Sequence, residues 1–310
     1  MKKLFLLFLA LNFSLFAKEV TVSILPQKYF VEKIAKDKIS VNVMVQPGFS
    51  PVTYEPKTSQ MRKLANSKVY FSIGVPFEKA WLEKFKNANK NLLVVDTTEG
   101  IEKLPMAKHS HEEEHDEHKE EHDEHKHDEH NHNSDHKHEQ DHEDEHEHEG
   151  LDPHVWLDPI LVKIQAKNIY KTLVKIDEAN SEFYQTNYEN FIKELDSLYL
   201  QLKEILTPVK DRAFMVFHPS WGYFAKRFTL EQIAVEVQGK EPKPNQLVEL
   251  INEAKEHNIK IVFVAPQFSQ KSAKVIASSI KGDAVIMDPL VENWKEGLIK
   301  TSKQIVDSYK

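Results

Sequence analysis

The chain has 310 residues, 40% of them hydrophobic and 10% aromatic, which is enough for two compact domains of ordinary size. It contains no cysteine, and this excludes disulfides and thiolate metal ligands. The formal net charge of −8 originates in one segment, residues 109–149, which holds 19 acidic residues and three lysines. The rest of the chain has a modest basic excess without clustered Arg or Lys, so nucleic acid binding is not expected.

Residues 1–17, MKKLFLLFLALNFSLFA, have the pattern of a secretory signal peptide. Two lysines precede an apolar run that is shorter than the roughly 20 residues of a membrane-spanning helix. Ala17 supplies a small residue at the cleavage site. The sequence therefore predicts a periplasmic protein with no membrane insertion once the signal is removed, and no cysteine follows that could carry a lipid anchor.

The stretch after the signal alternates between strand and helix patterns. Strands are predicted at Val20–Ile24, Ser40–Val45, Lys68–Gly74 and Asn91–Thr98, and helices at Gln27–Lys36, Lys57–Asn66 and Phe77–Asn87. Such alternation predicts an α/β lobe with a mostly parallel sheet covered by helices on both faces. We assign residues 18–176 to this lobe.

Residues 109–149 interrupt the lobe with 14 of the 17 histidines of the chain and no aliphatic or aromatic side chain. We expect this segment to be a disordered loop, because it has nothing to bury in a core. The histidines are His109, His111, His115, His118, His122, His125, His127, His130, His132, His136, His138, His142, His146 and His148. A solvated acidic linker would explain the carboxylates but not the imidazoles, which are ligands for Zn, Cu and Ni. The loop is therefore predicted to capture metal at several weak sites, and capture should fade in mild acid as the imidazoles protonate.

The second half of the chain repeats the alternation. Residues 177–208 have apolar residues at helical spacing without Gly or internal Pro, and predict one long linking helix. A second α/β lobe is predicted over 209–310, with strands at Asp211–His218, Thr229–Glu236, Lys260–Phe268 and Asp283–Pro289, and helices at Pro244–His257, Ser269–Ile280 and Trp294–Ser308.

Three histidines lie outside the acidic loop. His257 ends a polar helix, where a solvated side chain is the better interpretation. His218 ends a predicted strand, and Asp288 ends the last one, at the sheet edge where ligands collect in doubly wound folds. His154, in GLDPHVWLDP, has either a structural role near a turn or faces the same cleft. Two imidazoles and one carboxylate would suit Zn, and also Mn or Fe(II).

The combination of DPHVWLDP, FHPSWGYFAKRF, VAPQFS and MDPL, after a His-rich acidic insert, resembles the periplasmic zinc-binding receptors of ABC uptake transporters. This is the ZnuA-type branch of a family that also includes manganese receptors. The resemblance implies two α/β lobes joined by a long rigid helix, with one metal ion in the inter-lobe cleft. It also implies that His154, His218 and Asp288 bind Zn²⁺, which the protein, acting as a monomer, delivers to a permease driven by an ATPase.

One position departs from the family pattern. Where the family usually has His in a PG-x-x-PH turn, this chain has PGFSPVTYEP with Val52, which cannot coordinate a metal. Water, Tyr54, Glu55 or a loop histidine could complete the coordination sphere. A three-ligand site with water also fits a zinc hydrolase, although the HExxH spacing occurs only inside the acidic segment, at residues 111–115, 138–142 and 142–146, where we expect a disordered loop. A manganese receptor and a zinc buffer without a transporter are further alternatives. The many imidazoles favour zinc over manganese, and we expect no enzyme activity.

Overall fold

The computed structural model describes residues 18–106, 150–236 and 240–310. The predicted signal peptide and all 14 loop histidines therefore lie outside the described residues. None of the helices in the described ranges is long and apolar enough to cross a membrane.

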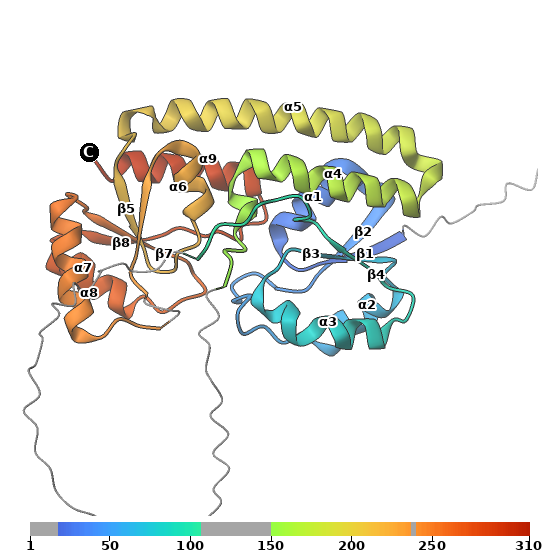
Figure 1. Ribbon diagram of the computed structural model, residues 1–310, viewed down its shortest axis with the longest axis horizontal. Coiled ribbons are helices and arrows are strands. Elements are labelled where there is room, and N and C mark those ends of the chain that lie inside the picture. Colours follow the sequence, from blue (N-terminus) through green and yellow to red (C-terminus); the bar gives the residue numbers. More distant parts are fainter. Residues whose placement is uncertain (1–17, 107–149, 237–239) are drawn as a thin grey trace, which may run out of the picture.

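The first lobe is built on a four-stranded parallel sheet in the order β2-β1-β3-β4. The strands are β1 (Lys18–Val22), β2 (Ile39–Val43), β3 (Val69–Ser72) and β4 (Leu93–Asp96). The helices of this lobe are α1 (Leu25–Ala35), α2 (Thr58–Asn66), α3 (Pro76–Ala88) and α4 (Pro159–Ile176). Of the two central strands, β3 is buried throughout and β1 over its last three residues, as expected of a parallel sheet with helices on both faces (Figure 1).

The second lobe repeats this arrangement with the strand order β6-β5-β7-β8, again all parallel. The strands are β5 (Ala213–Val216), β6 (Glu231–Ala234), β7 (Ile261–Val264) and β8 (Asp283–Ile286). The helices are α6 (Gly222–Phe228), α7 (Pro244–Glu256), α8 (Lys271–Ser279) and α9 (Trp294–Asp307). The two predicted α/β lobes are thus confirmed. The short helix α6 was not predicted from the sequence, because its seven residues are too few to show a helical period.

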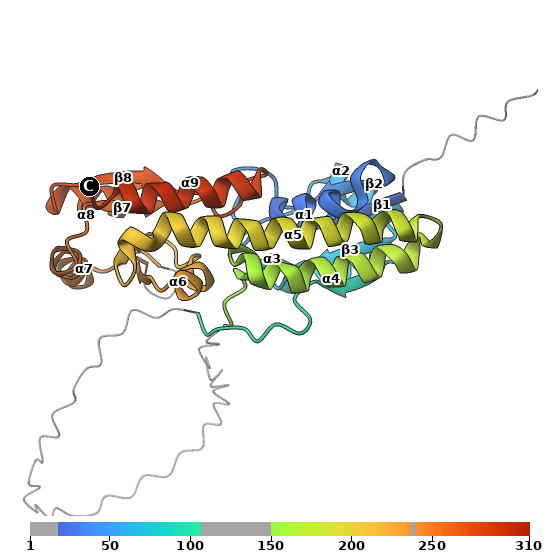
Figure 2. The same cartoon turned by 90° about the horizontal axis from the view of Figure 1, so that it is seen from above.

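The predicted long helix is α5 (Ser181–Leu206), which runs along both lobes (Figures 1 and 2). Short 3-10 turns at Glu178–Asn180 and Thr207–Val209 flank it, close to the predicted bounds 177–208. Its apolar stripe packs against α1 and α4 of the first lobe and against α9 of the second. The helix is therefore a shared wall of both lobes rather than a free strut.

Two tryptophans form the joint between the lobes below α5. Trp156 donates its indole N–H to the carbonyl of Pro289 at 2.8 Å, and Trp294 donates its own to the carbonyl of Trp156 at 2.8 Å. Both side chains are fully buried, and Trp294 packs edge-on against Phe30 with ring centroids 5.0 Å apart. One continuous hydrophobic core runs through this joint, so the lobes are tightly coupled.

Candidate metal centre

His154 is held in place by its own turn. Its backbone N–H donates to Oδ1 of Asp152 at 2.9 Å, and its ring Nδ1 lies 2.6 Å from the same oxygen. The turn is fixed by Tyr223, whose hydroxyl donates to the Asp152 carbonyl at 2.9 Å and accepts from the Leu104 N–H at 2.8 Å. Pro153 and the 3-10 turn that follows make this geometry local to DPHVWL. His154 is 7% exposed, so its imidazole has a defined orientation.

His218 comes from the other lobe, directly after β5. Its Nδ1 lies 2.7 Å from Oε1 of Glu236, which follows the neighbouring strand β6 and is 7% exposed. The backbone N–H of Glu236 donates to the Phe217 carbonyl at 3.0 Å, which extends the pairing of these two strands. Phe268 stacks on the imidazole with ring centroids 4.6 Å apart.

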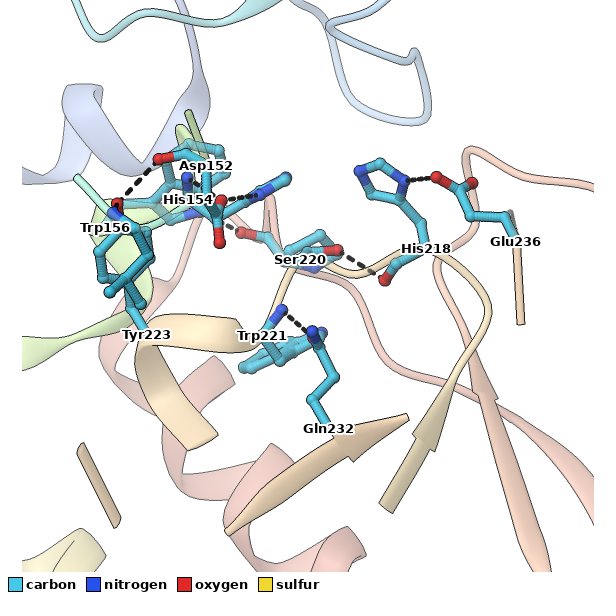
Figure 3. Close-up of polar contacts among 11 residues, drawn as sticks. Asp152, His154, Trp156, His218, Ser220, Trp221, Tyr223, Gln232 and Glu236 are labelled. Carbon is cyan, nitrogen blue, oxygen red and sulfur yellow. Dashed lines mark hydrogen bonds and ion pairs between the residues drawn. The ribbon is translucent and has the colours of Figure 1, made fainter. Parts of the chain in front are cut away.

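The two imidazoles face each other across the lobes, with ring centroids 5.3 Å apart (Figure 3). A carboxylate only accepts hydrogen bonds, so each Nδ1 carries the proton, and in the neutral tautomer Nε2 has the lone pair that a metal would take. Burial lowers the pKa of His154, and Asp152 offsets this shift only in part. Neutral imidazoles with carboxylates on the far nitrogen are the usual form of histidine ligands to metals.

Asp288 lies after β8, as predicted, and is half-buried. Its Oδ1 accepts hydrogen bonds from Nε2 of Gln267 at 3.0 Å and from the backbone N–H of Leu290 at 2.9 Å. Among the described residues, no three His, Cys, Asp or Glu side chains lie close enough together to hold a metal ion. The structure therefore brings the two imidazoles together, while coordination by Asp288 stays a prediction.

The two alternative ligands from the PGFSPVTYEP stretch lie elsewhere. Tyr54 is buried and donates its hydroxyl to Oε1 of Gln60 at 2.7 Å, and its ring packs against Phe77. Glu55 is exposed. Neither residue lines the cavity beside the imidazoles, whereas Val52 does.

That cavity has a volume of about 380 Å³ and is lined by both lobes. Both imidazoles form part of its wall, together with Val52, Lys79 and Lys103. Most of the remaining lining is apolar. His257, by contrast, is the C-cap of α7, is half-buried and is not part of this wall.

The described residues on either side of the segment with 14 histidines lie at this cavity. Pro105 and Leu151 pair as an antiparallel bridge, and the N–H of Met106 donates to the Gly150 carbonyl at 3.1 Å. Met106, Gly150 and Leu151 also line the cavity. The two described stretches that flank the segment are therefore next to each other at the cavity.

Sequence reasoning missed the two carboxylates that orient the imidazoles. Asp152 stands two residues before His154 in DPH, and this spacing is a local signal that could have identified it. Glu236 lies 18 residues after His218 and meets it only because β5 and β6 pair. The sequence analysis did not assign Gln267 as the partner of Asp288, because that contact also depends on the neighbouring strands β7 and β8.

Two parallel-sheet lobes along one long helix, with paired imidazoles at their junction, define a metal-binding solute-binding protein. The model of the family described as zinc-uptake complex component A, periplasmic, matches residues 20–309, and the chain belongs to this family. A relative from Bacillus subtilis, named high-affinity zinc uptake system protein ZnuA, is 27% identical and covers 94% of this chain and 86% of its own length. The zinc-binding protein AdcA of Streptococcus pyogenes is 24% identical over 94% of this chain and 53% of its own length.

Comparison with solved structures shows the same fold in several metal-binding proteins. A crystal structure of ZnuA superimposes with a TM-score of 0.80 at 38% identity, covering 95% of this chain and 100% of that one. A zinc-bound deletion mutant of ZnuA gives 0.78 at 37% identity, covering 94% and 98%. A manganese-bound protein of Candidatus Liberibacter asiaticus shares the fold, with a TM-score of 0.73 at 19% identity and coverage of 94% and 100%.

Proposed function

We propose that the chain is a periplasmic receptor that binds one zinc ion between its lobes and delivers it to an ABC permease driven by an ATPase. The observation that carries this proposal is the pair of facing imidazoles, each with Nδ1 held by a buried carboxylate. This arrangement preorganises two neutral nitrogen donors on opposite lobes, which a receptor needs and an apolar core does not. The receptor acts as a monomer and binds no nucleic acid.

Zinc is the metal that these donors favour. Neutral imidazole suits Zn, whereas Mn prefers carboxylate, carbonyl and water oxygens. The names of the ZnuA and AdcA relatives support the same assignment. A manganese receptor of the same family is the second candidate, because a relative with this fold is manganese-bound.

His154 and His218 are proposed as the first two ligands, and Asp288 as the third. Two hydrogen bonds already hold Oδ1 of Asp288, so its second oxygen is the proposed donor to the ion. Val52 leaves the family's remaining position without a protein ligand, and a small oxygen or nitrogen donor from solution would fill it.

The segment 109–149 is proposed to capture zinc and raise its concentration next to the cleft. The flanking residues Met106 and Gly150 line the cavity, so zinc bound to the segment would be tethered near the imidazoles. We expect a chain without this segment to load more slowly from scarce zinc, with the same final affinity. Equal loading rates would contradict this role.

Two alternatives compete with the receptor. A zinc hydrolase needs a general acid or base beside the metal-bound water, whereas Asp152 and Glu236 are held at the Nδ1 atoms of the histidines. No enzyme activity is therefore proposed. A zinc buffer without a transporter would rely on the acidic segment alone and leave the cleft without tight binding.

The test is a zinc titration against a chromophoric competitor, using chain 18–310 with 107–149 replaced by a short turn. The bridge between Pro105 and Leu151 brings the two ends of the replacement together. We expect one tight zinc site, weak manganese binding, and about a hundredfold or greater loss of zinc affinity in His154→Ala or His218→Ala. His257→Ala is the matched control and should bind like the parent.

The two other outcomes are distinct. A chain without the segment that binds no zinc tightly would identify a zinc buffer. Tighter binding of manganese than of zinc would identify a manganese receptor.

A further inference from the structure

The cavity is larger than a lone ion needs. Its volume of about 380 Å³ falls within the range of roughly 300–1,000 Å³ typical of sites for small organic molecules. A zinc ion is normally enclosed by ligands at about 2 Å, and a water molecule occupies only about 30 Å³. The cleft therefore has room for an organic molecule beside the ion.

The protein also leaves part of the coordination sphere open. Val52 lines the cavity at the position where the family pattern has histidine, and its side chain has no lone pair to offer. The nearby Tyr54 cannot replace it as placed, because its hydroxyl is bonded to Gln60. Ser50 also lines the cavity, but its hydroxyl accepts the N–H of Val52 at 3.2 Å. Since PGFSPVTYEP has no nitrogen-bearing side chain, a nitrogen donor at this wall must come from outside the stretch.

Two lysines on the same wall are unusual for a cation site. Lys79 is on α3, and Lys103 follows β4. The ammonium of Lys103 lies 2.8 Å from the point where a Cβ on residue 74 would stand, and Gly74 has a positive φ of +91°. Glycine thus provides space for this ammonium beside the cavity. Two ammonium groups repel a divalent cation, and an anion that lies between them and the metal removes this conflict.

We propose that the cleft takes zinc together with a small, carboxylate-bearing chelator of amino-acid size. A nitrogen donor of the chelator completes the coordination sphere at Val52, and its carboxylate pairs with Lys79 and Lys103. The apolar lining, including Phe268 and Leu290, packs against its carbon atoms. This inference rests on the proposed receptor function and specifies the chemical form of its ligand.

The experiment is equilibrium dialysis of chain 18–310, with segment 107–149 intact, against zinc and radiolabelled L-histidine. Histamine is the matched probe, because it has the same imidazole and amine but no carboxylate. The His218→Ala chain measures how much labelled histidine is retained by zinc that is bound to the loop histidines. Above this background, we expect about one histidine per chain, and less histamine.

Variants locate the carboxylate. Lys79→Gln and Lys103→Gln should each weaken histidine retention by about three- to tenfold and leave histamine retention unchanged. Lys203→Gln on α5 removes the same charge from an exposed position outside the cavity and should behave like the parent. Val52→His should keep zinc but lose the retained histidine, because it supplies the missing donor from the protein.

Each contrary result has a separate meaning. Zinc bound in the cleft with no histidine above the His218→Ala background overturns the chelate and leaves the receptor function intact. Lys79→Gln and Lys103→Gln chains that retain as much histidine as the parent chain also overturn it. If His218→Ala changes neither zinc nor histidine retention, the cleft site itself is absent and both proposals fail.

Discussion

The two lobes have the same strand order, yet their sheet edges at the cleft carry different chemistry. In the second lobe, each strand is followed by a polar side chain, and these are His218, Glu236, Gln267 and Asp288. All four belong to the imidazole and carboxylate hydrogen bonds at the cleft. This edge places the imidazole of His218 and the side chain of Gln267 on the cavity wall.

In the first lobe, the polar groups at the corresponding edge bond to one another. Gln27 is fully buried; its amide donates to the carbonyls of Phe71 and Ser72 at 3.2 Å, and its oxygen accepts from the N–H of Ser23 at 3.0 Å. Glu78 accepts from Ser23 and from the backbone N–H of Gly74 at 2.9 Å. This edge is a closed network that stabilises the lobe, and the cavity wall on this side is formed by other segments, with Val52, Lys79 and Lys103 among its residues.

The comparison shows that topology fixes where ligand positions lie, while residue type decides whether they serve binding or stability. Substitutions in the first edge should therefore change stability and leave metal affinity intact. Substitutions in the second edge should do the opposite.

The largest effect is expected for Gln27→Ala. It leaves buried carbonyls and a buried N–H without partners, which costs about 3–5 kcal/mol of unfolding free energy. Urea unfolding of the metal-free chain measures this loss, and Gln185→Ala at an exposed position of α5 should stay within about 0.5 kcal/mol. Zinc affinity of folded Gln27→Ala should match the parent, and a large loss of affinity would contradict the division between the two edges.

Glu78 gives this network a pH dependence. Burial raises the pKa of Glu78 from 4.5 to about 7, and hydrogen bonds from Ser23, Gly74 and Ile73 offset the shift only in part. Since the pKa is higher in the folded chain than in the unfolded one, this contribution to stability is full below about pH 4.5. It is lost as the pH rises to about 7.

Glu78→Gln should remove that dependence. Between pH 5 and 8, the parent should lose on the order of 2 kcal/mol more unfolding free energy than the variant. Urea unfolding of both metal-free chains at the two pH values measures this difference, in which other titrating groups cancel. Parallel profiles would show that Glu78 stays ionised in the folded chain.

On the second edge, Glu236→Gln tests the support of an imidazole. The amide still fills the space but is a weaker acceptor for the Nδ1 proton of His218, so zinc affinity should fall about ten- to hundredfold. Competitive titration of the chain without 107–149 measures the zinc affinity of this variant and of its parent. Glu231→Gln, at the exposed start of β6, is the matched control and should leave affinity unchanged. A drop in unfolding free energy without a change in zinc affinity would assign Glu236 to stability instead.

Sequence reasoning succeeded where the signal was local. The alternation of strand and helix patterns along the chain predicted the strands and most helices, since each element carries its own apolar pattern. The strand-end argument identified His218, and the resemblance assigned His154 beside it; the structure places their rings 5.3 Å apart. For both residues, the sequence signal lies in the segment that contains the residue itself.

The same reasoning failed for groups that act across elements. The sequence did not identify Glu236 as the partner of His218, because their contact depends on the pairing of β5 and β6. The closed network around Gln27 was invisible for the same reason, since one amide joins α1, β3 and the residue after β4. Nor does the sequence show that Tyr54 bonds to Gln60 instead of facing the cleft.

The smallest effect is expected for the movement of the two edges toward each other on zinc binding. Separating or rotating the lobes breaks the indole hydrogen bonds of Trp156 and Trp294 at the joint and disturbs the packing of α5 on α1, α4 and α9. Each buried hydrogen bond left unmade costs about 1–3 kcal/mol, and an ion can only drive motion by binding one arrangement more tightly than the other. The radius of gyration from small-angle scattering of the chain without 107–149 should therefore differ by less than about 1 Å between metal-free and zinc-loaded forms. A larger change would mean that the joint opens as a hinge, and the cleft would then be assembled by zinc rather than preformed by the two sheet edges.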